Sequence, residues 1–385
     1  MVLCGCHLRR DPAQTYQDAR LKFQRGDLTG AYAESDSAYH EYLGKNADWA
    51  SRFQALNAEI LFSRGFNEDA LALLAAPIPT GTIPADVSVR RNMIRGQANY
   101  SLQRFAQAQQ DLNAAENLAK STAPDLLGDV ALAQGTLDVM LNDLSSAEVA
   151  FRSSLRVAFE TKQPFLETKA LGSLGRLAMI QGHYDEAVDW YEKALDLAQS
   201  LGAQTLVAKI LGNEGWNYYK LGDFEKAENL FERARADSSR LGLYQDELVW
   251  VTNIGTMKYD VHSYAPAEQD YQQALDLARK LDNNAATANC LNNLAHVAVM
   301  EEKYDRAEQY NGEALALERA SKDRSLELFS LITESYIATG NKDFPQAESE
   351  LNEVLREKTS DSYLRWQAES ALANVYAVED RPARA

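Results

Sequence analysis

The sequence predicts an all-α fold in which pairs of helices stack into a solenoid. Apolar residues recur three and four positions apart through most of the chain, which is the spacing of an amphipathic helix. The helical stretches come in pairs separated by short turns, and the pairs repeat every 40 residues in the middle of the chain. Because one pair cannot bury its apolar stripe alone, neighbouring pairs have to cover it.

The stretch 208–242 shows how one pair is encoded. Its apolar residues at helical spacing are Ile210, Leu211, Trp216, Tyr219, Ala227, Leu230, Phe231 and Ala234. Between the two runs, Gly222 can end the first helix and Asp223 can cap the second. We therefore expect a helix hairpin here.

Small and aromatic residues keep a fixed register in successive pairs. In one pair the register of small, aromatic, Ala, aromatic and Ala comprises Gly215, Phe224, Ala227, Phe231 and Ala234. The corresponding residues 40 positions earlier are Gly175, Tyr184, Ala187, Tyr191 and Ala194, and 40 positions later Gly255, Tyr264, Ala267, Tyr271 and Ala274. This register resembles the tetratricopeptide repeat (TPR). The resemblance implies a right-handed α-solenoid of about ten TPR-like helix hairpins.

The repeats are longer than the common 34-residue unit. Arrays of this extended type are similar to those of kinesin light chains, of spindle-orientation adaptors, and of bacterial proteins in which the array precedes a CHAT (caspase-like) protease domain. The segment Leu291–Leu317 is especially similar to the kinesin light chain type of repeat.

Taken in order, helix pairs are expected at 12–43, 48–76, 87–120, 126–160, four times within 165–320, and at 325–358. This gives residues 1–10 as an unstructured segment or lipoprotein signal remnant, 11–124 as degenerate repeats, 125–362 as regular repeats and 363–385 as an incomplete tenth repeat. We expect the native chain to continue past Ala385. The proline-rich stretch 77–86 is expected to be an inter-repeat connection, with a hinge as the alternative.

Composition narrows the choice of partners. The net charge is −17, and the acidic excess lies after residue 124 because the first 124 residues hold 13 basic and 13 acidic side chains. An acidic surface repels nucleic acid and anionic lipid, so neither is an expected partner. No apolar run is long enough for a transmembrane helix. Three cysteines in 385 residues exclude a disulfide framework.

The first residues contain Leu3-Cys4-Gly5-Cys6, which resembles a bacterial lipobox. Lipidation of Cys6 would anchor the protein to a membrane. The positive and apolar regions that normally precede such a site are missing, so an unstructured terminus is the alternative. The compartment stays undetermined: cytoplasmic, or membrane-anchored if Cys6 is lipidated.

Asparagine recurs at one place in the first helices, as Asn213, Asn253 and Asn293. Asn is a weak helix former, so its recurrence at intervals of 40 residues calls for a reason. In the families that this chain resembles, Asn at this place binds the backbone of an extended peptide, since a carboxamide offers a donor and an acceptor together. The alternative is that each amide bonds to a neighbouring helix and fixes its packing.

The same face of the first helices carries further candidate contacts for a peptide. These are Lys169, Arg176, Lys209, Trp216, Tyr219, Tyr259, Asn292, His296 and Tyr336. Trp216 and Tyr219 can form one aromatic wall, and Lys209 and Arg176 can attract a carboxylate. For each aromatic residue, a place in the core is the alternative.

The sequence gives little support for catalysis, a cofactor or a metal site. Five scattered histidines accompany no phosphate-binding loop and no metal-spaced cluster. Cys290 and His296 are six residues apart in one helix, which places them on different faces.

The leading hypothesis is a non-enzymatic scaffold that binds an extended peptide or protein segment in a concave groove through the asparagine ladder. The alternative is the sensor or regulatory half of a larger bacterial protein with a downstream effector such as a CHAT protease domain. A third hypothesis is a self-associating assembly scaffold, because an incomplete last repeat exposes an apolar face.

Overall fold

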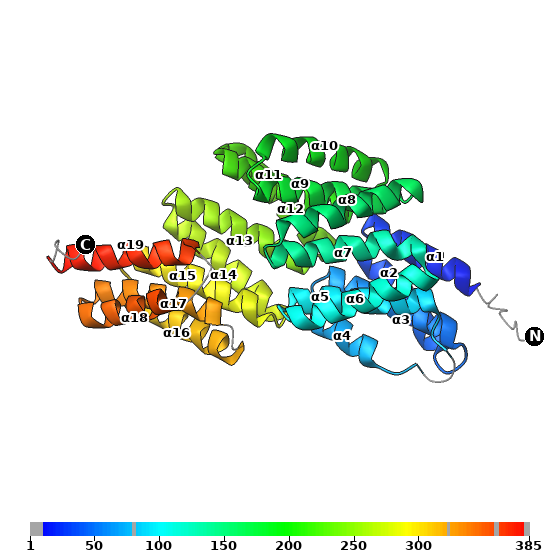
Figure 1. Ribbon diagram of the computed structural model, residues 1–385, viewed down its shortest axis with the longest axis horizontal. Helices are drawn as coiled ribbons and strands as arrows, with labels where there is room; N and C mark the ends of the chain where they lie inside the picture. Colours follow the sequence, from blue (N-terminus) through cyan, green and yellow to red (C-terminus); the bar gives the residue numbers. More distant parts are fainter. Residues whose placement is uncertain (1–10, 79–81, 322–323, 358–361, 381–385) are drawn as a thin grey trace, which may run out of the picture. The chain divides into compact units, whose positions relative to one another are not determined.

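The protein consists of helices in repeated hairpins, as the sequence predicts. The computed structural model describes residues 11–78, 82–321, 324–357 and 362–380. Within these ranges all regular secondary structure is helical. Consecutive helices pack side by side, as Figure 1 shows for α5 (Ala85–Ser101) and α6 (Phe105–Thr122), drawn in cyan. The all-α repeat fold is therefore confirmed.

The chain divides into two compact units, residues 1–250 and 251–385, with the boundary inside α13 (Tyr244–Asp260). Besides α5 and α6, the first unit contains α1 (Pro12–Arg25), α2 (Leu28–Tyr42), α3 (Ala47–Ser63), α4 (Asn67–Ala75), the short 3-10 helix η1 (Pro124–Leu126), α7 (Leu127–Met140), α8 (Leu144–Glu160), α9 (Pro164–Ile180), α10 (Tyr184–Ser200), α11 (Gln204–Leu221) and α12 (Phe224–Leu241). The second unit contains α14 (Tyr264–Lys280), α15 (Asn284–Met300), α16 (Tyr304–Ser321), α17 (Arg324–Gly340), α18 (Phe344–Arg356) and α19 (Ser362–Val378). This division follows contacts, whereas the division at residue 124 follows the regularity of the repeats.

Helix boundaries follow from capping residues. Gly222 ends α11 in the left-handed conformation, with φ 82°, and its N–H donates to the carbonyl oxygens of Tyr218 and Tyr219. The next residue, Asp223, caps α12 by accepting a hydrogen bond from the N–H of Lys226 at 3.1 Å. As predicted, Gly222 therefore ends the first helix of this hairpin and Asp223 caps the second.

The left-handed turn position persists where glycine does not. His262, Glu302 and Lys342 occupy it at intervals of 40 residues after Gly222, with φ between 59° and 62°. A left-handed conformation costs a residue with a Cβ about 1–2 kcal/mol. The packing of the helices on either side therefore sets this turn, and glycine only makes it easier.

The small and aromatic positions pack against each other within each hairpin. A methyl group at Gly175 would lie 2.7 Å from Cε1 of Tyr191, whose side chain is fully buried. In the second unit, a methyl group at Gly255 would lie 2.9 Å from Tyr271. The small residue is thus required because an aromatic ring lies directly on the first helix.

Some predictions concern residues outside the described ranges. These are the disorder or lipidation of segment 1–10 with Cys6, the centre of the proline-rich stretch at 79–81, and the continuation past Ala385. Pro345 lies in the first turn of α18, where its missing N–H is tolerated. No described helix combines the length and apolar character needed to cross a lipid bilayer.

Candidate functional site

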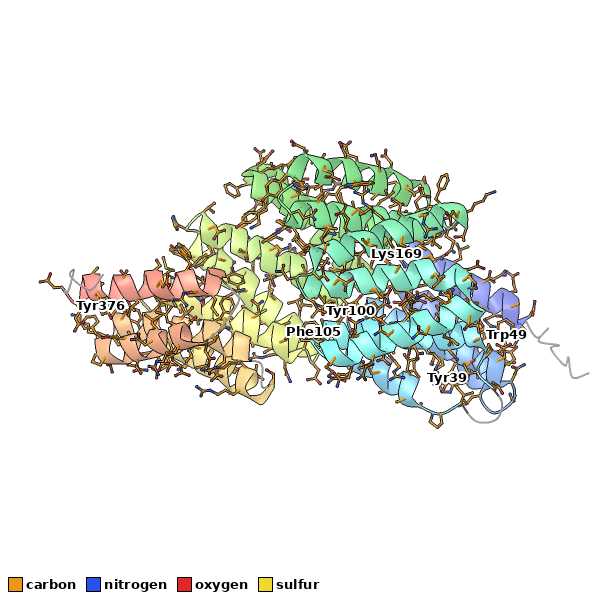
Figure 2. The ribbon with its side chains drawn as sticks, viewed as in Figure 1. Tyr39, Trp49, Tyr100, Phe105, Lys169 and Tyr376 are labelled. Carbon is orange, nitrogen blue, oxygen red and sulfur yellow. The ribbon has the colours of Figure 1, made fainter. Side chains whose placement is uncertain are left out.

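The first helix of each hairpin in the first unit contributes to one internal hollow of about 320 Å³, which we call the chamber. Its lining comes from α1, α3, α5, α7, α9 and α11, with Leu243 added from the turn after α12. Tyr100 of α5 and Lys169 of α9, both labelled in Figure 2, are part of it. The described second helices contribute none of the lining, so the chamber is an inner surface of the repeat array.

Contacts join the start and the end of the first unit beside the chamber, which Leu243 lines. Leu243 is 1% exposed and belongs to the same apolar cluster as Ala19, Leu28 and Ile60. Gly26, at the end of α1, lies so close to α12 that an added methyl group would be 3.2 Å from Cδ2 of Leu241. Burial of these apolar groups holds α1 against the end of the unit.

A second contact joins α3 and α4 to the start of α13. The guanidinium of Arg64 lies 5.3 Å from the ring centroid of Phe66 and 5.7 Å from that of Tyr244. The two rings also meet edge to face, with centroids 5.8 Å apart. Cation–π and edge-to-face contacts of this kind are each worth about 1 kcal/mol.

A buried ion pair lies in the chamber wall. The carboxylate of Glu59 accepts a hydrogen bond from Arg20 at 2.8 Å, and the Glu59 residue is only 9% exposed. Burial opposes the charge of Glu59, but Arg20, Arg90 and Lys169 outweigh it and lower the pKa of Glu59 to about 2. Glu59 is therefore ionised at neutral pH, and its negative charge offsets the positive charge of Arg20 in the chamber wall.

Arg176 occupies a different part of the wall. Its side chain is half-buried, and no hydrogen bond or ion pair links it to another residue of the described chain. Burial lowers its pKa, although a guanidinium keeps its proton in proteins. The nearby Tyr100 hydroxyl is buried, which raises the pKa of Tyr100 to about 12, so it is neutral and can donate.

Lys209 was predicted to offer a charge to a ligand, and it does line the chamber. Its ammonium group also lies 3.4 Å from a carboxylate oxygen of Asp246 in α13. Burial raises the pKa of Asp246, and the charge of Lys209 opposes that rise. Part of the charge of Lys209 is therefore neutralised within the protein.

The three asparagines of the predicted ladder lie on first helices and are half-buried. Asn213 lines the chamber in the first unit, and Asn253 belongs to the second unit. Neither side chain hydrogen-bonds to another described residue. Asn293, also in the second unit, donates to Asn289 at 3.2 Å on its own helix. None of the three fixes the packing of two described helices.

Asn292 behaves differently from its neighbour in sequence. Its amide nitrogen donates to Glu318 of α16 at 2.9 Å, and its oxygen accepts from the hydroxyl of Ser330 of α17, also at 2.9 Å. Both ends of the amide are therefore engaged between three helices. Asn217 is likewise structural, because it is fully buried and donates to the carbonyl of Tyr184 at 3.2 Å.

Trp216 and Tyr219, predicted to form an aromatic wall, stack on each other, and neither is among the residues that line the chamber. The rings of Trp216 and Tyr219 have centroids 4.8 Å apart and an interplanar angle of 30°. The ammonium of Lys220 lies 4.9 Å from the Trp216 ring and 5.2 Å from the Tyr219 ring. Trp216 also packs partly against the apolar cluster around Tyr191, so it combines a core contact with a half-exposed edge.

His296, Tyr336 and Tyr259 belong to the second unit. The rings of His296 and Tyr336 meet edge to face at 6.1 Å, and Nε2 of His296 lies 2.9 Å from the Thr333 hydroxyl. Burial lowers the pKa of His296 to about 4, so this imidazole is neutral at pH 7. Burial, together with Tyr264, Tyr336 and Asp260, raises the pKa of Tyr259 to about 12. His296 and Tyr259 are therefore neutral at physiological pH.

Cys290 has the character of a core residue. It is 2% exposed, and burial raises the pKa of its thiol to about 12. A thiol of this kind is protonated at neutral pH and is a poor nucleophile. Among the described residues no group of three or more His, Cys, Asp or Glu side chains is arranged to hold a metal ion.

A family model described as "Tetratricopeptide repeat" matches residues 166–238 and 247–320. The chain contains tetratricopeptide repeats. The two matched stretches include Arg176, Lys209 and all three asparagines of the ladder.

Other proteins with tetratricopeptide repeats resemble the chain over different lengths. Human outer dynein arm-docking complex subunit 4 is 22% identical over 162 residues, which cover 42% of this chain and 24% of that protein. The chain thus spans about a quarter of the length of this relative. A Rap protein complexed with Competence and Sporulation Factor has a TM-score of 0.60 and 13% identity, over 97% of this chain and 98% of that one.

A second similar structure is NprR in complex with its cognate peptide NprX. Its TM-score is 0.51 at 15% identity, over 76% of this chain and 84% of that one. At these identities the structural comparisons establish the fold.

About half of the residues that line the chamber lie on helix pairs for which the sequence predicts no site residue. Arg20, Glu59 and Tyr100 lie in the degenerate repeats before residue 124. One signal was available: Thr136 precedes Arg176 by 40 residues, and Gln97 precedes Thr136 by 39. All three line the chamber, so a polar register extends from the degenerate repeats into the regular ones.

Proposed function

We propose that the protein is a non-enzymatic interaction scaffold that binds extended protein or peptide segments on the first helices of its repeats. In the first unit the amide of Asn213 would contact the backbone of a bound segment, and in the second unit the amides of Asn253 and Asn293 would do the same. This proposal extends the tetratricopeptide fold, which commonly presents such inner surfaces for binding.

The proposal rests on the side-chain amides of Asn213 and Asn253, which are free to bind a peptide. Both side chains are half-buried on a first helix and lack a hydrogen-bond partner within the described chain. A carboxamide that is left unpaired in this way can donate to a peptide carbonyl and accept from a peptide N–H. The contrast with Asn217 and Asn292, which bond between helices, argues against a packing role for the ladder.

The complex of NprR with its cognate peptide NprX gives further support, because a similar solenoid there holds a peptide. Each amide would contribute only about 1 kcal/mol net. Three amides do not produce tight binding by themselves, so side chains such as Trp216 and Tyr219 would supply additional apolar contacts.

The test is a selection of peptides from a phage-displayed library on the full chain, followed by affinity measurements on the enriched peptides. We expect the triple variant N213A/N253A/N293A to keep its helicity and melting temperature while losing at least tenfold in affinity. The matched control is Asn217→Ala, which should lower the melting temperature and leave peptide affinity unchanged. Failure to enrich any peptide, or unfolding of the triple variant, would contradict the proposal.

A further inference from the structure

The chamber is rich in cations although the protein is acidic overall. Its lining includes the four cations Arg20, Lys169, Arg176 and Lys209 and the two acids Glu59 and Asp129. Arg90 adds another cation in an adjoining hollow of about 180 Å³, whose lining includes Arg20, Asp129 and Lys169. A positive interior in a chain of net charge −17 indicates a site that favours an anion.

The internal ion pairs do not neutralise this excess. Arg20 pairs with Glu59 and Lys209 with Asp246, but Arg176 has no acidic partner among the described residues. An unpaired, partly desolvated charge destabilises a folded protein. Such a charge is typical of a binding site, where a ligand supplies the missing partner.

Two tyrosines, Tyr100 in the chamber wall and Tyr191 in the core beneath α9, interact electrostatically with Arg176. Tyr100 is electrostatically coupled to it, and the Tyr100 hydroxyl interacts with Gln97 and Thr136 of the same wall. The hydroxyl of Tyr191, also coupled to Arg176, is buried without a hydrogen-bond partner in the described chain. The planar guanidinium of Arg176 and the neutral hydroxyl of Tyr100 can both donate hydrogen bonds, which suits the oxygens of a carboxylate or phosphate.

The rest of the wall is apolar. It includes Phe23, Phe62, Leu132, Phe165, Leu206 and Leu243. Small-molecule sites generally have volumes of about 300–1,000 Å³ and combine apolar walls with a few polar groups. At about 320 Å³ the chamber fits a small organic molecule and is too small for a long peptide segment.

We infer that the chamber is a binding site for a small organic anion, with its carboxylate or phosphate on Arg176 and its apolar body against Phe62, Leu132 and Leu206. The site shares residues with the proposed peptide surface, but the inference stands on the chamber and does not depend on peptide binding. Loss of the charge at Arg176 should weaken anion binding at least tenfold without loss of stability.

The experiment is a ligand-observed NMR screen of the full chain with aromatic and aliphatic carboxylates and phosphate monoesters. Each anion is paired with a neutral amide or alcohol that keeps the same apolar ring, for example phenylacetate with phenylacetamide and phenyl phosphate with benzyl alcohol. We expect anions to bind at least tenfold more tightly than their neutral counterparts. The two sets of anions distinguish a carboxylic acid from a phosphate ester.

Arg176→Met keeps the apolar stem and removes the charge, so it should lower anion affinity at least tenfold. Because it removes an unpaired charge, the melting temperature of the unliganded variant should stay the same or rise by about 2–4 °C. Arg152→Met, which removes an exposed arginine paired with Glu148 on α8, is the matched control and should bind anions normally.

The inference is overturned if no anion binds better than its neutral counterpart, or if Arg176→Met binds anions like the wild type. If Arg176→Met does not fold, Arg176→Lys decides, because lysine keeps the charge without the two parallel N–H donors. A tenfold weaker anion affinity in a folded Arg176→Lys variant supports the inference, and unchanged affinity overturns it.

Discussion

The guanidinium of Arg64 lies 5.7 Å from the ring centroid of Tyr244, although 180 residues separate the two in sequence. This contact joins α3 and α4 to the start of α13 and so helps to hold the two ends of the first unit together. Neighbouring repeats account for most contacts in a solenoid, so a contact of this range marks a departure from simple stacking.

Replacing Tyr244 with Leu tests this closure. The variant keeps an apolar side chain but loses the cation–π and edge-to-face contacts, so we expect the first unit to lose about 1 kcal/mol of stability. Hydrogen exchange in α1 should become faster, because its contact with α11 depends on closure. The control is Lys193→Met, which removes a cation–π contact with Trp190 within α10. Equal exchange in α1 of both variants would argue against closure by Arg64 and Tyr244.

Alanine substitutions at two glycines with positive φ in the first unit separate the cost of backbone strain from the cost of steric crowding. Gly26 has φ 95° and lies against Leu241, whereas Gly44 has φ 77° and has no atom within 4 Å of an added methyl group. Gly44→Ala should therefore cost about 1 kcal/mol through backbone strain. Gly26→Ala should cost about 2–3 kcal/mol, because the contact between α1 and α12 must also shift. Urea unfolding measures both, and equal losses would show that Gly26 is not a tight contact.

Two glycines of α9 should respond to alanine with opposite signs. At Gly172 the nearest atom to an added methyl group is Cγ1 of Ile210 at 3.7 Å, so Gly172→Ala should stabilise the helix by up to about 1 kcal/mol. At Gly175 the ring of Tyr191 is 2.7 Å away, and Gly175→Ala should destabilise by about 1–3 kcal/mol. Thermal unfolding of the two variants checks the signs. Stabilisation by Gly175→Ala would contradict the small and aromatic register.

His296 makes the stability of the second unit depend on pH. Its pKa is about 4 in the folded protein and about 6.5 in the unfolded chain, so the unfolded state binds the proton first as the pH falls. The stability from the neutral imidazole is complete above pH 6.5 and is lost between pH 6.5 and 4, up to about 3 kcal/mol.

Replacing His296 with Gln should make unfolding free energy less dependent on pH in that window. The measurement is urea unfolding of the wild type and the variant at several pH values between 4 and 7. Because all acidic groups are common to both proteins, the difference between the two curves isolates His296. Parallel curves would show that this imidazole titrates normally in the folded state.

Helix positions and hairpin contacts could be predicted from the sequence because they depend on residues close in the chain. The predicted pairs agree with the observed helices within a few residues, and Gly175 meets Tyr191 as the register requires. The inner face was also predicted in part: Lys169, Arg176, Lys209 and Asn213 all line the chamber. The helical period alone places these side chains on one face.

The sequence by itself thus determined the repeat, its caps and the faces of α9 and α11 that line the chamber, since these follow from spacing within about 40 residues. Only the tertiary structure decided that Leu243 joins Ala19 in one apolar cluster, that Lys209 meets Asp246, and that Arg176 has no acidic partner. These outcomes depend on which distant groups the curvature of the first unit brings together. Small rotations between successive hairpins accumulate over many repeats, and no local pattern of residues encodes their sum.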